Sequence, residues 1–230
     1  HTATDFYHHY KEDIAMFAEL GFKAFNMTLS WARIFPKGIK AGINPEGVEF
    51  YHNVFKECLK YGIEPLVHLY KYDMPAFYIE ELGGWKNRAL IGEFVEFGKA
   101  SIDEFQEVTY WSTFNEINAA QFSILDSNNQ EEVQRQYQVL HNQLVASAKV
   151  VKYLHDNYSD KKIGCMQAGI FTHALTCDPN DELANQKEMH KNFWYAGDVF
   201  VRGYYPSYAK YLWKELNITL DITEEDTKAL

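Results

Sequence analysis

Apolar residues recur every three or four positions along several stretches of the chain, which is the spacing of one helix face. The first stretch covers residues 4–20, and Gly21 follows it as a helix C-cap. Further helices are predicted at 45–61, 88–105, 131–158 and 181–200. The longest of them has an expected buried stripe of Val133, Tyr137, Leu140, Leu144, Val145, Ala148 and Val151.

Runs of β-branched and aromatic residues separate these helices and are typical of strands. They cover 22–31, 63–70, 108–114 and 162–168. Alternation of strands and helices implies parallel strands that are covered by helices. Two folds have this order, an open doubly wound sheet and a (β/α)8 barrel. No G-x-G-x-x-G motif follows a strand, so nothing supports the dinucleotide-binding version of the open sheet.

Polar residues gather where the expected strands end, and these ends favour the barrel. In a barrel they converge on one mouth, where the chemistry takes place. We therefore predict one α/β domain of the (β/α)8 TIM-barrel type, residues 1–230, with about four strand–helix units. A four-stranded part leaves two strand edges unpaired, which predicts completion by further segments or association into a homo-oligomer. The polar residues are Ser30, Arg33, Lys71, Asp73, Asn115, Glu116 and Gln167.

Composition narrows the classes of partner. Hydrophobic residues make up 47% of the chain, including 16 Tyr, 16 Phe and 5 Trp, and such rings either fill a core or stack on sugars. The net charge of −10 argues against a nucleic acid partner. No signal peptide or membrane-spanning apolar run is visible. Cys58, Cys165 and Cys177 lack a C-x-x-C spacing, which predicts reduced thiols in a cytoplasmic protein without a metal or cofactor.

Glu116 is the leading candidate for chemistry because it follows the strand at 108–114. A carboxyl beside aromatic rings suits a general acid, and glycoside hydrolysis requires such an acid together with a second carboxylate. The neighbouring Asn115 has an amide that can donate to and accept from a sugar hydroxyl. A second interpretation is open, in which Asn115 and Glu116 only begin a helix near Ile117.

The strand at 63–70 is followed by two further candidates. Lys71 can bind an anionic group or a hydroxyl of a substrate, or it can be a solvated loop lysine. Asp73 is predicted to be a helix N-cap before Pro75. His8 and His9 fall on the first helix, away from the strand ends, so we interpret them as surface or packing residues.

Sequence motifs occur in a fixed order along the chain. Residues 5–14 read D-F-Y-H-H-Y-K-E-D-I, residues 31–38 read W-A-R-I-F-P-K-G, and G-G-W at 83–85 precedes T-F-N-E at 113–116. This order resembles the family 1 glycoside hydrolases. I-N at 117–118, I-G-C-M at 163–166, L-T-C-D-P at 175–179 and R-G-Y-Y-P at 202–206 are similar to the bacterial 6-phospho-β-glucosidases of that family.

The resemblance implies a (β/α)8 barrel of which this chain holds strands two to five. It implies retaining hydrolysis of β-glucosides that are phosphorylated at the 6 position. Glu116 would be the acid/base, and Asn115 would hold the 2-hydroxyl of the sugar. Lys71 stands where the family has a histidine that binds the glycone.

Other features depart from the family. The nucleophilic glutamate of the family lies in an E-N-G motif after the seventh strand, and this sequence has no such motif. The loop that grips the sugar phosphate is also missing, and Asn26 stands where the family has an arginine. We therefore expect the 230 residues alone to be inactive, as part of a longer glycosidase. The alternative is a non-catalytic remnant that binds sugar phosphates or acts as a scaffold.

Overall fold

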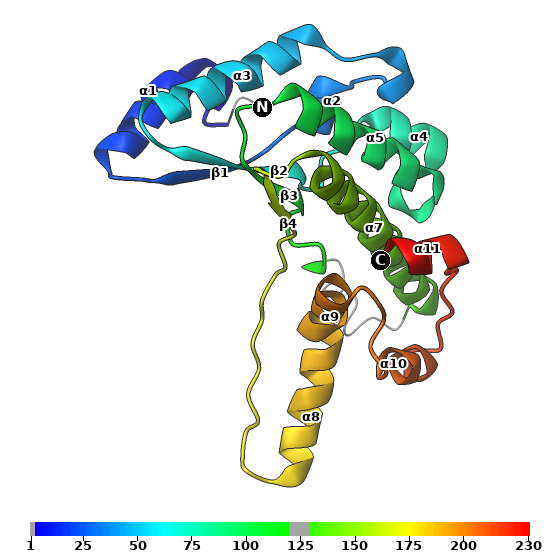
Figure 1. Cartoon of the computed structure of the whole chain (residues 1–230). Coiled ribbons are helices and arrows are strands. Elements are labelled where there is room, and N and C mark those ends of the chain that lie inside the picture. Colours follow the sequence, from blue (N-terminus) through cyan, green and yellow to red (C-terminus); the bar gives the residue numbers. More distant parts are fainter. Residues whose placement is uncertain (1–2, 120–128) are drawn as a thin grey trace.

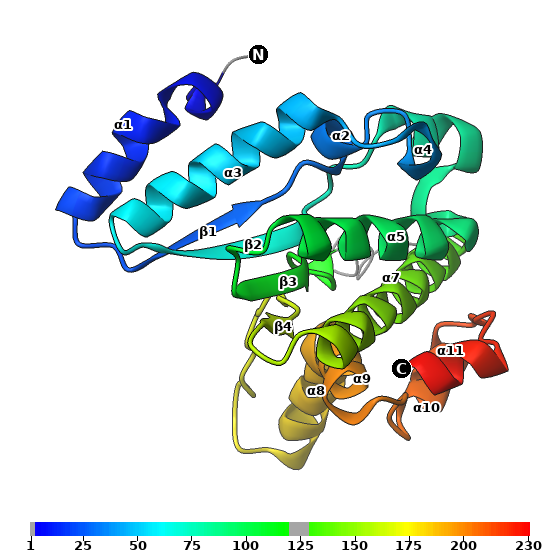
Figure 2. The same cartoon turned by 45° about the horizontal axis from the view of Figure 1, so that its top comes forward.

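The computed structural model describes residues 3–119 and 129–230. Its sheet has four strands, and their order in the sheet is their order in the chain. All three neighbouring pairs are parallel, so each connection crosses back through helical structure (Figures 1 and 2). A doubly wound sheet reverses direction from its first strand, whereas this steady progression is the barrel order. The strands are β1 (Ala24–Thr28), β2 (Glu64–Tyr70), β3 (Tyr110–Phe114) and β4 (Lys162–Gly164).

Long helices follow the pattern expected from apolar periodicity. They are α1 (Phe6–Glu19), α3 (Pro45–Lys60), α5 (Ala89–Glu104) and α7 (Gln130–Asn157). In the parts of the chain that are described, no helix has the length and apolar character needed to cross a membrane. The shorter helices are α2 (Trp31–Ile34), α4 (Ala76–Leu82), α8 (Pro179–Met189), α9 (Tyr195–Arg202), α10 (Ala209–Glu215) and α11 (Glu224–Ala229), with 3-10 turns at Ile39–Ala41 and Gly84–Lys86.

The core lies between the sheet and the helices and is rich in aromatic rings. The ring of Phe25 on β1 packs against Phe17 of α1 at 5.2 Å between centroids. Phe114 at the end of β3 stacks on Phe94 of α5 at 4.7 Å. Gly98 lets α5 approach α7 closely, because a Cβ at this position would lie 2.9 Å from Val150. Many of the rings counted in the sequence therefore belong to the core.

The opposite face of the sheet is open to solvent in part, whereas His68 and Ser112, which pair on the same face, are buried. One row of paired residues crosses this face through Asn26, Leu66, Tyr110 and Lys162. Tyr110 is 44% exposed, and Asn26 and Lys162 are exposed as well. Within the described residues, β1 and β4 have a strand neighbour on one side only. The expected association or completion of the sheet stays a prediction.

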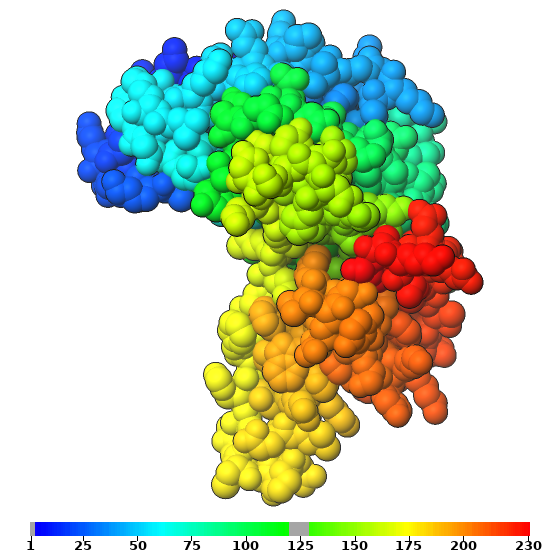
Figure 3. All heavy atoms as spheres, viewed as in Figure 1, coloured from blue at the N-terminus to red at the C-terminus, as the bar shows by residue number. Residues whose placement is uncertain are grey.

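An arm leaves the body after β4. Residues 165–178 run outward without regular structure, and α8 returns toward the body (Figure 1). Figure 3 shows this arm in yellow, projecting away from the rest of the molecule. The single helix predicted at 181–200 is wrong in detail, because a π-helical turn at His190–Trp194 separates α8 from α9.

Two of the predicted strands are too long. The strand predicted at 22–31 ends at Thr28, since the Ser30 hydroxyl accepts a hydrogen bond from the Arg33 N–H at 3.1 Å and begins α2. The strand predicted at 162–168 ends at Gly164, where the ladder with β3 stops. The N-cap predicted at Asp73 is also wrong, because α4 begins at Ala76 directly after Pro75.

Candidate active site

The end of β3 is fixed on both sides. The Asn115 N–H donates to the Tyr70 carbonyl of β2 at 2.9 Å, and the Ile117 N–H donates to the Met166 carbonyl at 3.1 Å. The Phe114 ring beneath it is enclosed by the rings of α5 and Trp85. The backbone at 115–117 is therefore hydrogen-bonded to its neighbours on both sides. These bonds fix the position of the Glu116 backbone, from which the carboxyl extends.

Glu116 itself is half-buried and has a left-handed backbone, with φ of 50°. Its Oε2 accepts a hydrogen bond from the Tyr72 hydroxyl at 3.3 Å. Tyr72 also has a left-handed φ, of 58°. Burial first, and then the charge of Glu116 and this hydrogen bond, raise the pKa of Tyr72. The phenol therefore stays protonated at neutral pH and remains a donor to the carboxylate.

A cavity of about 260 Å³ lies beside this strand end. Asn115 lines it and is 7% exposed, and its amide nitrogen has no hydrogen-bond partner within the described structure. Of the described residues around the cavity, Glu116 is the only one with a carboxyl group. The lining is Tyr70, Tyr72, Gly83, Gly84, Trp85, Lys86, Phe114, Asn115, Glu116, Ile117, Arg135, Val139 and Gln143.

Two cationic side chains line the same cavity. Arg135 is held by Glu132 through two hydrogen bonds, of 2.8 and 2.6 Å. Lys86 is exposed and forms no ion pair with any residue that the structure describes. An unpartnered amide donor, a carboxylate and a free ammonium group can bind a ligand that carries hydroxyls and a negative charge.

Lys71 lies outside the cavity beside Glu116. Its side chain is exposed. It lies near His68, whose pKa is lowered mainly by burial and further by the charge of Lys71. Asn26 is exposed on the open face of the sheet. The substrate-binding role of Lys71 stays a prediction.

The interpretation of Asn115 and Glu116 as a helix start is met only in part. Glu116 has a left-handed rather than a helical backbone, although its carbonyl accepts from the Ala119 N–H at 2.9 Å. Ala119 is helical, which agrees with the helix that was expected near Ile117, and residues 120–128 lie outside the described residues.

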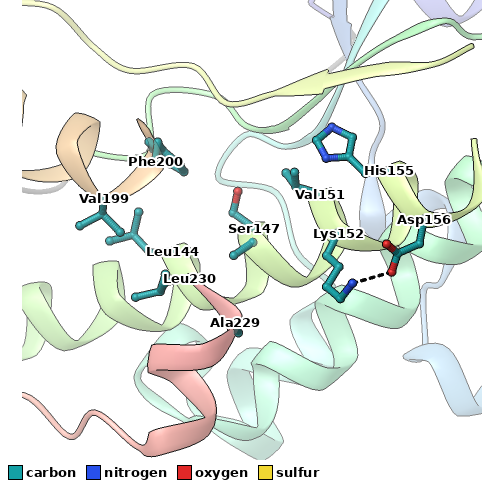
Figure 4. A pocket seen from close by; sticks show the side chains of 11 residues that line it. Leu144, Ser147, Val151, Lys152, His155, Asp156, Val199, Phe200, Ala229 and Leu230 are labelled. Atoms are coloured by element: carbon teal, nitrogen blue, oxygen red, sulfur yellow. Dashed lines mark hydrogen bonds and ion pairs between the residues drawn. The ribbon is translucent and has the colours of Figure 1, made fainter. Parts of the chain in front are cut away.

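Another cavity, of about 360 Å³, lies away from the strand ends between α7, α9 and Leu230 (Figure 4). Leu144 and Val199 are among its aliphatic lining, and its ion pair joins Lys152 and Asp156 at 2.8 Å. It contains no residue from a strand end. The candidate chemistry therefore belongs to the cavity beside Glu116 and not to this one.

Two of the three cysteines are poor candidates for a nucleophile. All three are free, and burial raises the pKa of the Cys58 thiol to about 11 and that of Cys165 to about 12. These two thiols therefore remain protonated at neutral pH, which makes them poor nucleophiles.

Sequence reasoning did not single out Tyr72 or Lys86. Tyr72 comes two residues after Tyr70, the last residue of β2, just as Glu116 comes two residues after the end of β3, and this shared offset is a signal that could have found it. Lys86 closes the Gly84–Lys86 turn beside the anchored Trp85. Its direction depends on that turn, which the sequence pattern does not specify.

Known proteins share much of this sequence. The chain is 42% identical over 237 residues to an aryl-phospho-beta-D-glucosidase of Bacillus subtilis, covering 100% of this chain and 50% of the relative. It is 40% identical over 239 residues to a 6-phospho-beta-glucosidase of Escherichia coli, with the same coverage. The chain thus spans about half the length of these relatives.

A solved structure supports the fold. The beta-glucosidase from Thermotoga maritima, solved in complex with glucoimidazole, superposes with a TM-score of 0.83 at 28% identity, covering 98% of this chain and 52% of that one. The family model for glycosyl hydrolase family 1 matches residues 1–230. This chain is therefore a member of glycosyl hydrolase family 1, with a partial TIM-barrel fold.

Proposed function

We propose that this chain carries the acid/base half of a retaining glycosidase that hydrolyses β-glucosides phosphorylated at the 6 position. The observation that carries the proposal is the position of Glu116 at the end of β3, on a cavity that also presents the unpartnered amide of Asn115. The names of the relatives support the phosphorylated substrate.

The chemistry follows from the two side chains. Glu116, when protonated, gives its proton to the leaving glycosidic oxygen and later takes one from the attacking water. Asn115 donates from its amide to a hydroxyl of the sugar. Retention also requires a nucleophilic carboxylate roughly 5–5.5 Å from the acid. Glu116 has no carboxylate companion among the described lining residues, so we assign the nucleophile to the remaining part of a longer chain.

The test measures release of 4-nitrophenol from its 6-phospho-β-glucoside. We expect no turnover by the 230-residue chain, and turnover by a longer chain that carries the remaining strands of the barrel. In the longer chain, Glu116→Gln should lower kcat/KM by about 10²–10⁴-fold for poor leaving groups, which is the usual contribution of a general acid.

Glu131→Gln is the matched control, because Glu131 is an exposed carboxylate in the first turn of α7 that does not line the cavity. It should leave kcat/KM within about twofold of the parent, because substitutions of exposed residues away from the site have small effects. Turnover by the 230-residue chain that disappears in Glu116→Gln would contradict the two-part site. Full activity of the longer Glu116→Gln variant would contradict the acid/base role.

A non-catalytic sugar-phosphate-binding protein is the second candidate. Among the residues that the structure describes, the cavity lining has a single carboxylate and the Lys86 ammonium group forms no ion pair, and both features favour this candidate. Calorimetric titration of the 230-residue chain with glucose 6-phosphate tests this candidate. We expect the chain to bind the ligand, and Lys86→Ala to bind it more weakly. Absence of heat at millimolar ligand removes this candidate.

A further inference from the structure

The turn that carries Glu116 has a backbone that a glutamate does not adopt easily. A left-handed conformation is unfavourable for a residue with a Cβ, because the Cβ then lies too close to the following carbonyl oxygen. Such a conformation persists only where the surrounding structure holds it. On one side Asn115 is bonded to β2, and on the other side Ile117 is bonded to Met166. The next side chain along the turn, Asn118, adds the remaining restraint.

Asn118 is buried, with 1% of its surface exposed, and both ends of its amide are bonded. Its Nδ2 donates to the Ala168 carbonyl at 3.0 Å and to the Asn192 carbonyl at 2.7 Å. Its Oδ1 accepts from the Ala168 N–H at 2.8 Å. Both amide N–H groups and the amide oxygen are therefore used, so the side chain has a single orientation.

These three bonds join three separate segments. Asn118 belongs to the Glu116 turn, Ala168 to the extended segment after β4, and Asn192 to the π-helical turn between α8 and α9. π-Helical turns are rare in proteins, and those that occur are often found at functional sites. Here the turn directs a backbone carbonyl to Asn118, so the base of the arm and the Glu116 turn share one anchor.

We propose that Asn118 is the positioning residue for Glu116. It acts two residues away by locking the turn against Ala168 and Asn192, so that the Glu116 backbone stays left-handed and its carboxyl stays beside the Tyr72 hydroxyl. Without the three bonds, the turn relaxes toward ordinary backbone angles and the carboxyl moves. The consequence for catalysis rests on the acid/base role that we propose for Glu116.

The first experiment observes the carboxyl directly in the 230-residue chain. The side-chain carboxyl ¹³C resonance of Glu116 is identified by its loss in Glu116→Gln, and the Tyr72 ring resonances are followed with it. In Asn118→Ala we expect both sets to shift. The control is Gln167→Ala, because the Gln167 amide donates to the Phe193 carbonyl at 3.2 Å and joins the same arm to the π-helical turn without touching the Glu116 turn.

Gln167→Ala should leave both sets of resonances in place. Unchanged Glu116 and Tyr72 resonances in a folded Asn118→Ala variant would overturn the proposal, as would equal shifts in the control. If Asn118→Ala does not fold, Asn118→Asp replaces it. This variant keeps the acceptor for the Ala168 N–H but loses both donors, so an intermediate shift is expected and no shift counts against the proposal.

The second experiment uses leaving groups in the longer, active chain. A phenyl 6-phospho-β-glucoside needs a proton on its departing oxygen, whereas a 2,4-dinitrophenyl one departs without it. Misplacement of an acid by about 1 Å can cost about 10²-fold. We expect that loss in Asn118→Ala for the phenyl substrate and much less for the dinitrophenyl one, whereas equal losses would indicate a general structural defect. If the longer chain hydrolyses neither substrate, the proposed function fails while the resonance test still decides the role of Asn118.

Discussion

The C-terminal helix α11 is fastened to the body by a buried carboxylate. Asp226 is fully buried and accepts hydrogen bonds from both terminal nitrogens of Arg88, one of them at 2.8 Å. His141 lies 3.2 Å away through Nε2, and the Thr223 N–H donates to the same carboxylate at 2.9 Å. Burial alone would favour the protonated acid. The hydrogen bonds outweigh it and hold the pKa of Asp226 well below its usual range.

We predict that Asp226→Ala lowers the free energy of unfolding by about 3 kcal/mol. Removal of one partner from a buried ion pair costs about 3–5 kcal/mol, because the other charge is left without compensation. The Arg88 side chain is 37% exposed and can partly rehydrate, which places the cost at the lower end. For a chain of this size, about 3 kcal/mol corresponds to a fall in Tm of roughly 6–12 °C.

Urea titration followed by circular dichroism measures this cost. The control is Lys149→Ala, which removes the exposed ion pair between Lys149 and Glu225 of the same helix. Exposed pairs contribute about 0–1 kcal/mol, so this variant should unfold near the parent. If Asp226→Ala is no more destabilised than Lys149→Ala, then the buried carboxylate does not fasten α11.

The hydrogen bonds around Asp226 also predict that the free energy of unfolding falls at low pH. The lowered pKa of Asp226 means that its contribution is complete above its unfolded pKa of about 4 and is lost as the pH falls toward the folded value. Burial also lowers the pKa of His141, so protonation of the unfolded chain below about pH 6.5 further weakens the fold. The unfolding free energy of the parent should decrease in two stages on acidification. The stage near pH 4 should be smaller in Asp226→Ala, where only other carboxyls with a lowered pKa, such as those of Glu132 and Asp198, still contribute. A curve without that stage in the parent would refute the assignment.

Two further predictions concern the core and the site. Gly98→Ala should destabilise the fold by about 1–3 kcal/mol through overpacking against α7, whereas Gly92→Ala, on the same helix with open space at its Cβ, should stabilise it by about 0.5–1 kcal/mol; thermal melts that show equal effects would contradict this. Glu116→Gln should lower the pKa of Tyr72, because the Glu116 charge opposes formation of the phenolate; an ultraviolet pH titration that finds no change would show that the two groups are not coupled.

Helices and strand ends could be predicted from the sequence where the apolar pattern extended over many residues. The helix predicted at 131–158 is observed at Gln130–Asn157, because an apolar stripe persists over many turns. The end of the strand predicted at 108–114 is also confirmed at Phe114. Since strand ends meet at one edge of a parallel sheet, the place of Asn115 and Glu116 followed from that boundary.

The start of α2 and the π-helical turn could not be predicted from the sequence. Trp31 follows a segment rich in apolar residues and was therefore included in the predicted strand. The Ser30 hydroxyl begins a helix there instead, and the Ser30 backbone N–H donates to the distant Tyr51 hydroxyl at 2.7 Å. The π-helical turn likewise depends on a tertiary contact with Asn118. Neither the Tyr51 contact nor the Asn118 contact has a local signal, because its partner comes from a remote part of the chain.

The left-handed backbone of Glu116 sets stability against function at a single position. Asparagine and glycine tolerate that conformation better than glutamate does, so the fold alone would favour either of them there. A selection for thermal stability without a screen for activity would therefore favour variants in which Glu116 is replaced by asparagine or glycine. Engineering that aims to stabilise this chain should hold residue 116 constant and search for gains elsewhere.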